Sequence, residues 1–536
     1  MYLEKINSPA DVKKLSTAEM AKLAQEMRDA LIFKLSRHGG HCGPNLGFVE
    51  ATIAMHYVFN SPTDKMVFDV SHQTYCHKML TGRKDGFLYE EHFDDISGYS
   101  NPAESEHDFF VIGHTSTSVS LALGLAKARD LKHESGNVIA VIGDGSLSGG
   151  EALEAIDYAG EFDGNLIIII NDNDMSIAEN HGGIYQNLKL LRDTKGQAEC
   201  NLFKAMGFDY LYVDEGNNIE KMIEAFKKVK DVSHPTVLHI KTLKGHGLAV
   251  AEENKEAFHW IMPGVLDEKP ENAQNTVVED YSSLTKDFIM QKVKEDKTTV
   301  VVNAATPGVF GFDPEFRKKL GVHYTDVGIA EEHAVAYSSA LAKAGAKPIL
   351  TIMSSFVQRT YDQLSQDLCL NKSPLVILVY WGGISDADAT HLCSFDMSMM
   401  SNIPNLTYLC PVNKEEYLAM LEYAYAQNEG PVVIRVPSCQ LESCGCEDKT
   451  DYSISNKFKV VENGEKIALL GLGNFFNLAK DVKKEIQSKL NINATLINPK
   501  FISGIDKELL ESLKSNHQIV VTMEDGILDG GFGEKI

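Results

Sequence analysis

The sequence predicts an α/β protein with three consecutive domains, each built on a mainly parallel sheet. Short, continuously apolar runs, typical of strands covered on both faces, alternate with helical segments along most of the 536 residues. At roughly 100–200 residues per domain, the length alone allows about three or four. A stretch rich in charge and turn residues, 266–275, interrupts the alternation. We therefore expect domains at 1–265, 276–450 and 451–536.

The first domain is expected to open with two helices. Ser16 begins a Ser-Thr-Ala-Glu capping box, ahead of an apolar-periodic run that reaches about residue 36. A second helix is predicted over 48–59. Further along, strands are predicted at 138–142, 166–170 and 236–240, with a helix over 149–162 between the first two. Strand, helix and strand in this order form a parallel βαβ unit.

The second and third domains repeat the alternation. In the second, we expect strands at 299–303, 324–327, 348–352, 374–380 and 432–436. In the third, we expect a strand at 466–470, a helix over 479–490 and a strand at 494–497. The last residues, 531–536, resemble the start of a helix, so we expect the natural chain to continue past Ile536.

Charge and apolar patterning restrict the partners. Lys and Arg number 51 and Asp and Glu 75, a net charge of −24 that repels phosphate backbones, so no nucleic-acid partner is expected. The longest apolar runs are strand-sized, well short of the ~20 residues that cross a bilayer. Residues 1–14 contain no apolar signal core. The sequence predicts a cytoplasmic protein with small-molecule partners and no membrane partner.

The nine cysteines fit a reducing compartment, because they are odd in number and scattered. Cys439, Cys444 and Cys446 form one local group. Three thiols without a nearby fourth ligand make a poor zinc site, and we expect an ordinary surface loop there.

Two polar triplets mark the ends of neighbouring predicted strands. Gly143-Asp144-Gly145 follows the first, and Asn171-Asp172-Asn173 follows the second, with Asp144 and Asn173 29 residues apart. The carboxyl ends of adjacent parallel strands open into a ligand-binding crevice. The carboxylate of Asp144, the amide oxygen of Asn173 and a backbone carbonyl at Met175 suit Mg²⁺, which commonly shares its ligands with phosphates. The flanking glycines permit close approach of a diphosphate.

These triplets, extended through Ser146 and Ile177, resemble the thiamine diphosphate fingerprint. Within that superfamily the chain is similar to the 1-deoxy-D-xylulose-5-phosphate synthase family, in colinear order from about residue 15 to the end. The other segments that carry the resemblance are Gly40-His41 with Leu46-Gly47 and Glu50, Asp69-Val70-Ser71-His72-Gln73-Thr74-Tyr75, Gly113-His114-Thr115-Ser116-Thr117-Ser118, Ile329-Ala330-Glu331-Glu332-His333-Ala334-Val335 and Ser355-Phe356-Val357-Gln358-Arg359-Thr360-Tyr361-Asp362-Gln363.

The resemblance implies a role for each matching residue. Glu331 would share its proton with the aminopyrimidine ring of thiamine diphosphate, and Phe356 would stack on that ring. The remaining cofactor contacts would be His72, Gly113, His114, Thr115, Gly145, Ser146 and Asn173, with Asp144, Asn173 and Met175 holding Mg²⁺. Substrates would face His41, Arg359, Asp388 and His391, with Glu331, His41 and His391 catalytic. A homodimer in which the cofactor spans the first two domains is also implied.

The implied reaction joins pyruvate to D-glyceraldehyde 3-phosphate with loss of CO₂, giving 1-deoxy-D-xylulose 5-phosphate, a precursor of isoprenoids, thiamine and pyridoxal. The family's two phosphate-binding arginines are replaced here, near Trp381 and at Ser438. Serine and tryptophan lack the planar fork that grips phosphate. Three hypotheses stay open: a synthase with a rearranged phosphate site using Arg359 or Arg435, a related carboligase with another, possibly non-phosphorylated acceptor, and a catalytically silent cofactor-binding regulator.

Overall fold

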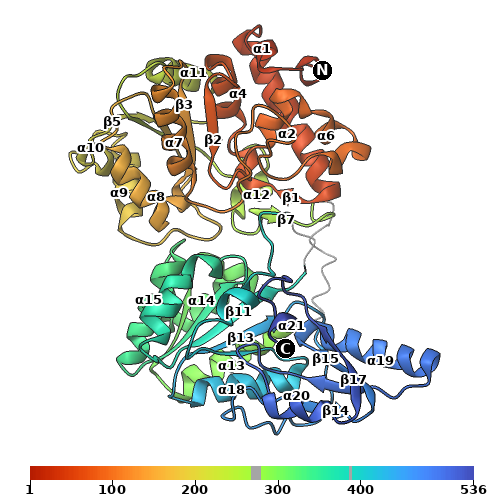
Figure 1. The fold of residues 1–536 in the computed structure, drawn as a ribbon. Coiled ribbons are helices and arrows are strands. Elements are labelled where there is room, and N and C mark those ends of the chain that lie inside the picture. The colour runs from red at the N-terminus through yellow and green to blue at the C-terminus, as the bar shows by residue number, and fades with distance from the viewer. Residues whose placement is uncertain (267–278, 385–388) are drawn as a thin grey trace. The chain divides into compact units, whose positions relative to one another are not determined.

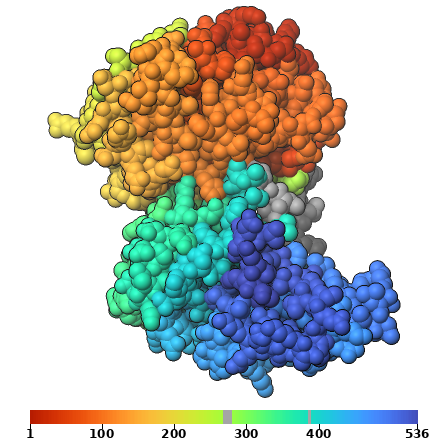
Figure 2. Space-filling view, in the orientation of Figure 1, coloured from red at the N-terminus to blue at the C-terminus, as the bar shows by residue number. Residues whose placement is uncertain are grey.

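The computed structural model of the chain describes residues 1–266, 279–384 and 389–536. The chain divides into two compact units, unit 1 at 1–275 and unit 2 at 276–536. Unit 1 runs from red to yellow-green and unit 2 from green to blue in the ribbon (Figure 1) and in the space-filling view (Figure 2). Unit 2 contains both the second and the third of the predicted sheets.

Unit 1 is built on five parallel strands in the order β2-β3-β4-β6-β5. Their bounds are β2 (Lys65–Phe68), β3 (Val138–Gly143), β4 (Ile167–Asp172), β5 (Asp209–Val213) and β6 (Thr236–Lys241). The predicted strands within β3, β4 and β6 are confirmed. Two strands were not predicted: β2, which is short, and β5, an edge strand that is only half-buried.

Helices cover both faces of this sheet (Figure 1). One face packs against α2 (Thr17–His38), α4 (Val49–Val58) and α11 (Ile219–Val229), and the other against α7 (Ser118–Leu131), α8 (Gly150–Ala159) and α9 (Gly183–Asp193). Alternate residues of β3 enter the two cores, Ile139 and Val141 on one side and Ala140 and Ile142 on the other. The predicted capping box is confirmed, because Ser16 N donates to Glu19 Oε2 at 2.8 Å.

Short elements complete unit 1, and one pair of them matters for the site. Strand β1 (Gly40–His41) pairs antiparallel with β7 (Trp260–Ile261), which joins two loops far apart in the sequence. The others are η1 (Leu3–Lys5), α1 (Pro9–Val12), α3 (Gly43–Leu46), α5 (Tyr75–Lys78), η2 (Met79–Arg83), α6 (Asp85–Leu88), η3 (Glu90–Asp95), η4 (Asp144–Ser148), α10 (Leu202–Ala205) and α12 (Ala249–Glu253).

Unit 2 contains two sheets. Six parallel strands run in the order β12-β13-β11-β10-β8-β9, and four run in the order β14-β16-β15-β17, where only β14 is antiparallel to its neighbour. The bounds are β8 (Thr299–Asn303), β9 (Tyr324–Asp326), β10 (Lys347–Met353), β11 (Val376–Gly382), β12 (Thr407–Leu409), β13 (Val432–Pro437), β14 (Lys459–Glu462), β15 (Lys466–Gly471), β16 (Thr495–Asn498) and β17 (His517–Met523). The predicted fold class, α/β with three mainly parallel sheets, is confirmed.

The helices of unit 2 again lie on both faces of its larger sheet. One face packs against α13 (Tyr281–Glu295), α14 (Pro314–Leu320) and α18 (Lys414–Ala426), and the other against α15 (Glu331–Lys343) and α17 (Asp396–Met400). The second of these cores continues into β15 and β16, so the two sheets share it. The remaining helical elements are η6 (Pro307–Phe310), η7 (Gly321–His323), η8 (Val357–Thr360), α16 (Tyr361–Gln363), η9 (Leu364–Cys369), η10 (Gly473–Phe475), α19 (Phe476–Leu490), α20 (Lys507–Leu513) and α21 (Phe532–Lys535).

Across residues 1–266, 279–384 and 389–536, no helix combines the length and apolarity needed to span a membrane.

The cysteines are all free thiols. Cys439, Cys444 and Cys446 lie exposed, as expected for a surface loop.

Candidate active site

Strands β3 and β4 of unit 1 bring the two polar triplets side by side. Gly143, the last residue of β3, pairs in register with Asn171 of β4. Asp144 and Asn173 therefore follow two adjacent parallel strands at the same edge of the sheet, as predicted. The next element is the short helix η4, which leads into the N-terminus of α8.

Asp144 is a buried carboxylate whose charge has no cationic side chain in hydrogen-bond contact among the described residues. Its Oδ2 accepts hydrogen bonds from Met175 N at 3.0 Å and Asn180 Nδ2 at 2.6 Å. Burial, reinforced by the nearby Asp172 carboxylate, raises the pKa of Asp144 above its usual range. Such a site favours a bound cation, because a cation would offset the cost of the buried charge.

Asp172 has a different role, although it directly precedes the predicted ligand Asn173. It is fully buried and paired with Arg192, whose Nη1 lies 2.8 and 2.7 Å from its two oxygens, and with His239 Nε2 at 2.8 Å. Burial opposes its ionisation, but His239 and Arg192 outweigh burial and hold the pKa of Asp172 below its usual range. Its charge is thus already compensated within the protein.

The surroundings of Asp144 fit a metal–diphosphate group. Asn173 Oδ1 is buried and accepts no hydrogen bond from any described residue, which leaves an amide oxygen for a ligand. A Cβ at Gly145 would lie 2.8 Å from Ser176 Cβ, so only glycine fits there. The described residues contain no cluster of three or more His, Cys, Asp or Glu side chains suited to a metal. A cation here would therefore rely on Asp144, neutral oxygens and its own phosphate ligands.

Hydrogen bonds made by Ser116 and Ser118 hold the preceding segment, Gly113-His114-Thr115, near this edge of the sheet. Asp69, at the end of β2, accepts from Ser116 N at 2.8 Å and Ser118 N at 2.9 Å. Ser116 Oγ in turn donates to Ser146 O at 3.0 Å. These bonds bring the predicted contacts at 113–115 and at Gly145 and Ser146 to one part of unit 1.

Three histidines of unit 1 meet in one cluster. The rings of His41 and His72 are 5.0 Å apart, and that of His259 lies 5.6 Å from His41 and 5.3 Å from His72. Asn45 Nδ2 donates to the carbonyls of both His41 and His72 at 2.8 Å and so ties their loops together. Burial, with Lys244 and the other two histidines, lowers the pKa of His259 well below its ordinary value.

No sequence motif indicates His259, which lies 218 residues after His41 and outside the segments that carry the family resemblance. The pairing of β1 with β7 places it there, next to the His41–Trp260 register pair. His114, a predicted cofactor contact, lies half-buried in the segment described above.

In unit 2, Glu331 is the first residue of α15 and is 4 % exposed. Its Oε2 is buried with no hydrogen-bond partner in the described parts of the chain, and Arg359 Nη1 lies 4.0 Å away. Burial raises the pKa of Glu331 to about 7, although the Arg359 guanidinium opposes the rise. The protonated form of Glu331 is therefore well populated at neutral pH, and the side chain has a polar atom available to a ligand.

Phe356 and Arg359 lie on one turn, in which Arg359 N donates to Phe356 O at 3.2 Å. The Phe356 ring lies 5.9 Å from that of His391, edge to face. Unit 2 thus brings Glu331, Arg359, Phe356 and His391 into a connected group. Asp388 lies outside the described residues.

Arg435, one of the two candidate phosphate anchors, is fully buried and already paired. Its Nε donates to Asp396 Oδ2 at 2.7 Å and its Nη1 to Asp525 Oδ1 at 2.6 Å. Asn474 joins this network by donating to Asp525 Oδ2 at 2.7 Å and to Ser438 Oγ at 3.1 Å. Because Asp396 and Asp525 already neutralise the charge of Arg435, this arginine is poorly suited to bind a phosphate.

Comparison with known proteins gives the class first. Residues 280–442 match the family described as the transketolase pyrimidine-binding domain, and residues 456–536 match the transketolase C-terminal domain. The three sheets and these matches define a transketolase-like α/β protein. A solved transketolase mutant from Pichia stipitis covers 95% of this chain and 90% of its own, at 17% identity and a TM-score of 0.41.

The particular family follows from longer matches. Residues 3–201 and 189–242 match the family described as 1-deoxy-D-xylulose-5-phosphate synthase. A protein of that name from Lachnoclostridium phytofermentans is 38% identical over 100% of this chain and 91% of its own length. One from Geobacter sulfurreducens is 35% identical over 100% and 89%. The chain belongs to the 1-deoxy-D-xylulose-5-phosphate synthase family.

Proposed function

We propose that this protein is a transferase that joins pyruvate to D-glyceraldehyde 3-phosphate, with loss of CO₂, to give 1-deoxy-D-xylulose 5-phosphate. Family membership over the whole chain supports the reaction, and thiamine diphosphate is the cofactor that the family implies. The single observation that supports catalysis best is Glu331, a buried carboxylic acid whose Oε2 has no hydrogen-bond partner among the described residues. A protein that only bound the cofactor would have no need of such a group.

When bound, thiamine diphosphate supplies a carbon nucleophile for the pyruvate ketone and holds the electrons released as CO₂ leaves. Glu331 would hold a proton at Oε2 and hydrogen-bond to the pyrimidine ring, which needs a protonated acid at working pH. Phe356 would give that ring an apolar face. Burial helps Glu331 to hold its proton, because it disfavours the ionised carboxylate.

Unit 1 would hold the diphosphate and its metal. Asp144, Asn173 and the Met175 carbonyl are the proposed Mg²⁺ ligands. Two observations support a hard cation there: Asn173 Oδ1 has no hydrogen-bond partner among the described residues, and no cationic side chain among them is hydrogen-bonded to the Asp144 carboxylate. Gly113, His114, Thr115, Gly145, Ser146 and His72 are the proposed diphosphate contacts. The backbone N–H groups of a glycine-containing turn suit such an anion.

The substrates would meet His41, Arg359, Asp388 and His391. Since Asp396 and Asp525 already neutralise Arg435, Arg359 is the arginine that we propose for the acceptor phosphate. The same neutralised arginine is the one observation in favour of the second candidate, a carboligase of this family with a different acceptor. Acceptor preference decides between the two.

The test is turnover by the purified chain with pyruvate, thiamine diphosphate and Mg²⁺, offered D-glyceraldehyde 3-phosphate or a panel of unphosphorylated aldehydes. We expect 1-deoxy-D-xylulose 5-phosphate with the first, and its loss in Glu331→Gln. The matched control is Glu332→Gln at the adjacent, half-buried acid. Product from another aldehyde only would replace this function with the second candidate.

Two further proposals concern organisation. We propose the domain boundaries 1–265, 276–450 and 451–536, which the matched segments 3–242, 280–442 and 456–536 support. We also propose a homodimer, because the family resemblance implies one. Light scattering on the purified protein measures the mass of the assembly directly.

A further inference from the structure

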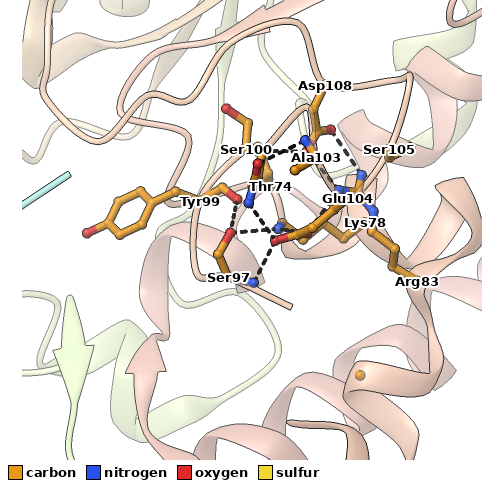
Figure 3. A network of polar contacts seen from close by, with 12 residues as sticks. Thr74, Lys78, Arg83, Ser97, Tyr99, Ser100, Ala103, Glu104, Ser105 and Asp108 are labelled. Atoms are coloured by element: carbon orange, nitrogen blue, oxygen red, sulfur yellow. Dashed lines mark hydrogen bonds and ion pairs between the residues drawn. The ribbon is translucent and has the colours of Figure 1, made fainter. Parts of the chain in front are cut away.

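A network of charged side chains in unit 1 has no part in the function proposed above (Figure 3). Lys78 Nζ donates to Glu104 Oε2 at 2.5 Å, and Arg83 donates from Nη1 and Nη2 to Asp108 at 2.7 and 3.0 Å. His77 Nε2 lies 3.0 Å from Asp108 Oδ1. The side chains of Lys78, His77 and Asp108 are 0%, 1% and 1% exposed.

The two acids of this network also hold the backbone of a loop. Glu104 Oε1 accepts from Ser97 N at 2.8 Å, and Asp108 Oδ2 accepts from Asn101 N at 2.8 Å. Ser97 Oγ donates to the carbonyl of Tyr99 at 2.8 Å. Residues 97–101 are therefore fixed at both ends by carboxylates that are themselves paired with buried cations, and Tyr99 lies between the two fixed points.

The ring of Tyr99 contacts the histidine cluster. It lies 5.7 Å from the His41 ring at an interplanar angle of 72°, an edge-to-face contact. The rings of His72 and His259 also lie next to His41. Of these three rings, which come from three separate loops, Tyr99 is the one whose loop the charged network holds.

Buried ion pairs are a costly way to stabilise a fold. Removing two charges from water can cost as much as their attraction returns, and apolar replacements are often as stable. What a buried pair supplies is a directional contact that fixes one geometry. In this network both acids also accept a hydrogen bond from the loop backbone, Glu104 through Oε1 and Asp108 through Oδ2, an oxygen that Asp108 shares with Arg83. The geometry that they fix is therefore that of residues 97–101.

We propose that Tyr99 is a positioning residue for His41, and that the Lys78–Glu104 and Arg83–Asp108 pairs are positioning residues for Tyr99. The inference rests on the proposed function only where it assigns His41 to the substrates. It predicts that breaking the Lys78–Glu104 pair changes the surroundings of His41, although none of these charged atoms touches the histidine ring.

The first test is the ring-proton NMR signal of His41 in the full-length protein, with labelled histidine and the assignment made from His41→Gln. Tyr99→Leu removes the neighbouring ring and Glu104→Gln removes one charge of the pair. Both should move the signal in the same direction, while Tyr99→Phe keeps it close to wild type. The control is Glu106→Gln, at an exposed acid two residues from Glu104.

A His41 signal that does not move in Glu104→Gln would overturn the proposal. If Glu104→Gln does not fold, Ser97→Ala takes its place. That variant removes the bond to the Tyr99 carbonyl and the 3.3 Å contact between Lys78 Nζ and Ser97 Oγ without leaving a buried charge. It should move the His41 signal as Tyr99→Leu does.

The second test asks whether the effect on the reaction passes through Tyr99. We expect Tyr99→Leu and Glu104→Gln each to lower kcat/KM about tenfold, and the double variant to lose no more than the worse single variant. Independent losses, about a hundredfold together, would mean that Glu104 acts by general destabilisation. A wild type that makes no product refutes the proposed function alone, because the NMR test still decides the positioning.

Discussion

Replacing Glu331 with glutamine should remove the proposed proton donor and also make the cofactor-free protein more stable at high pH. Burial raises the pKa of this acid from 4.5 to about 7. At about 1.4 kcal/mol for each pKa unit, this corresponds to about 3 kcal/mol of destabilisation once the buried group is ionised. Glutamine keeps the shape and never ionises, so Glu331→Gln escapes this cost.

The pKa values of Glu331 in the unfolded and folded states decide how stability changes with pH, and over which pH range. Below about pH 4.5 the acid is protonated in both the folded and unfolded states, and it costs the fold nothing. Between about 4.5 and 7 the unfolded chain loses the proton first, so stability falls as the pH rises. Above about 7 the cost is complete.

Urea unfolding of wild type and variant without cofactor, from about pH 5 to about pH 8.5, measures the difference. Relative to wild type, we expect the free energy of unfolding of Glu331→Gln to be little changed at about pH 5 and higher by about 3 kcal/mol at about pH 8.5. Glu332→Gln, at the neighbouring half-buried acid, is the control and should follow the wild-type curve. A difference that stays constant with pH, or favours the wild type at high pH, would refute this account of Glu331.

The other predictions concern the metal, the acceptor and the buried arginine. Asp144→Asn should weaken thiamine diphosphate binding by roughly tenfold to a hundredfold and abolish the effect of adding or chelating Mg²⁺, as measured by calorimetry; a variant that still responds to Mg²⁺ would remove Asp144 from the metal site. Arg359→Gln should raise KM for D-glyceraldehyde 3-phosphate about tenfold while leaving KM for unphosphorylated D-glyceraldehyde nearly unchanged, in steady-state assays with saturating pyruvate; equal effects on both would exclude a phosphate contact. Arg435→Ala should lower the free energy of unfolding by about 3–5 kcal/mol, because it leaves Asp396 and Asp525 buried without their cation; a loss below about 1 kcal/mol in denaturant unfolding would contradict the paired geometry.

Local sequence signals predicted most of the fold. The β8 strand matches its predicted range of 299–303, and the core strands β3, β4 and β6 lie within a residue or two of theirs, because continuous apolar runs are a strong signal. Several strands at sheet edges were not predicted, although β9, at one edge of the larger sheet of unit 2, lies at its predicted position of 324–327. Residues 518–520 of β17 and three of the four residues of β14 are exposed, so these edge strands lack the continuous burial of the central strands.

The site could be predicted only where its residues follow the end of a predicted strand. Contacts between segments far apart in the sequence could not be predicted, because they depend on the tertiary fold. Asp144 and Asn173 follow adjacent strands, so their proximity could be predicted from a βαβ unit. His259 reaches His41 only because β7 pairs with β1. Likewise, Asp525 neutralises Arg435 from 90 residues away, and no motif indicates that pairing.

The most direct test of the central claim is the product formed by the purified chain from pyruvate and D-glyceraldehyde 3-phosphate with thiamine diphosphate and Mg²⁺, followed by mass spectrometry together with released CO₂. We expect equal amounts of CO₂ and 1-deoxy-D-xylulose 5-phosphate in wild type and in Glu332→Gln, and neither in Glu331→Gln. If wild type binds the cofactor but makes no 1-deoxy-D-xylulose 5-phosphate, or if Glu331→Gln makes it at the wild-type rate, the account is contradicted.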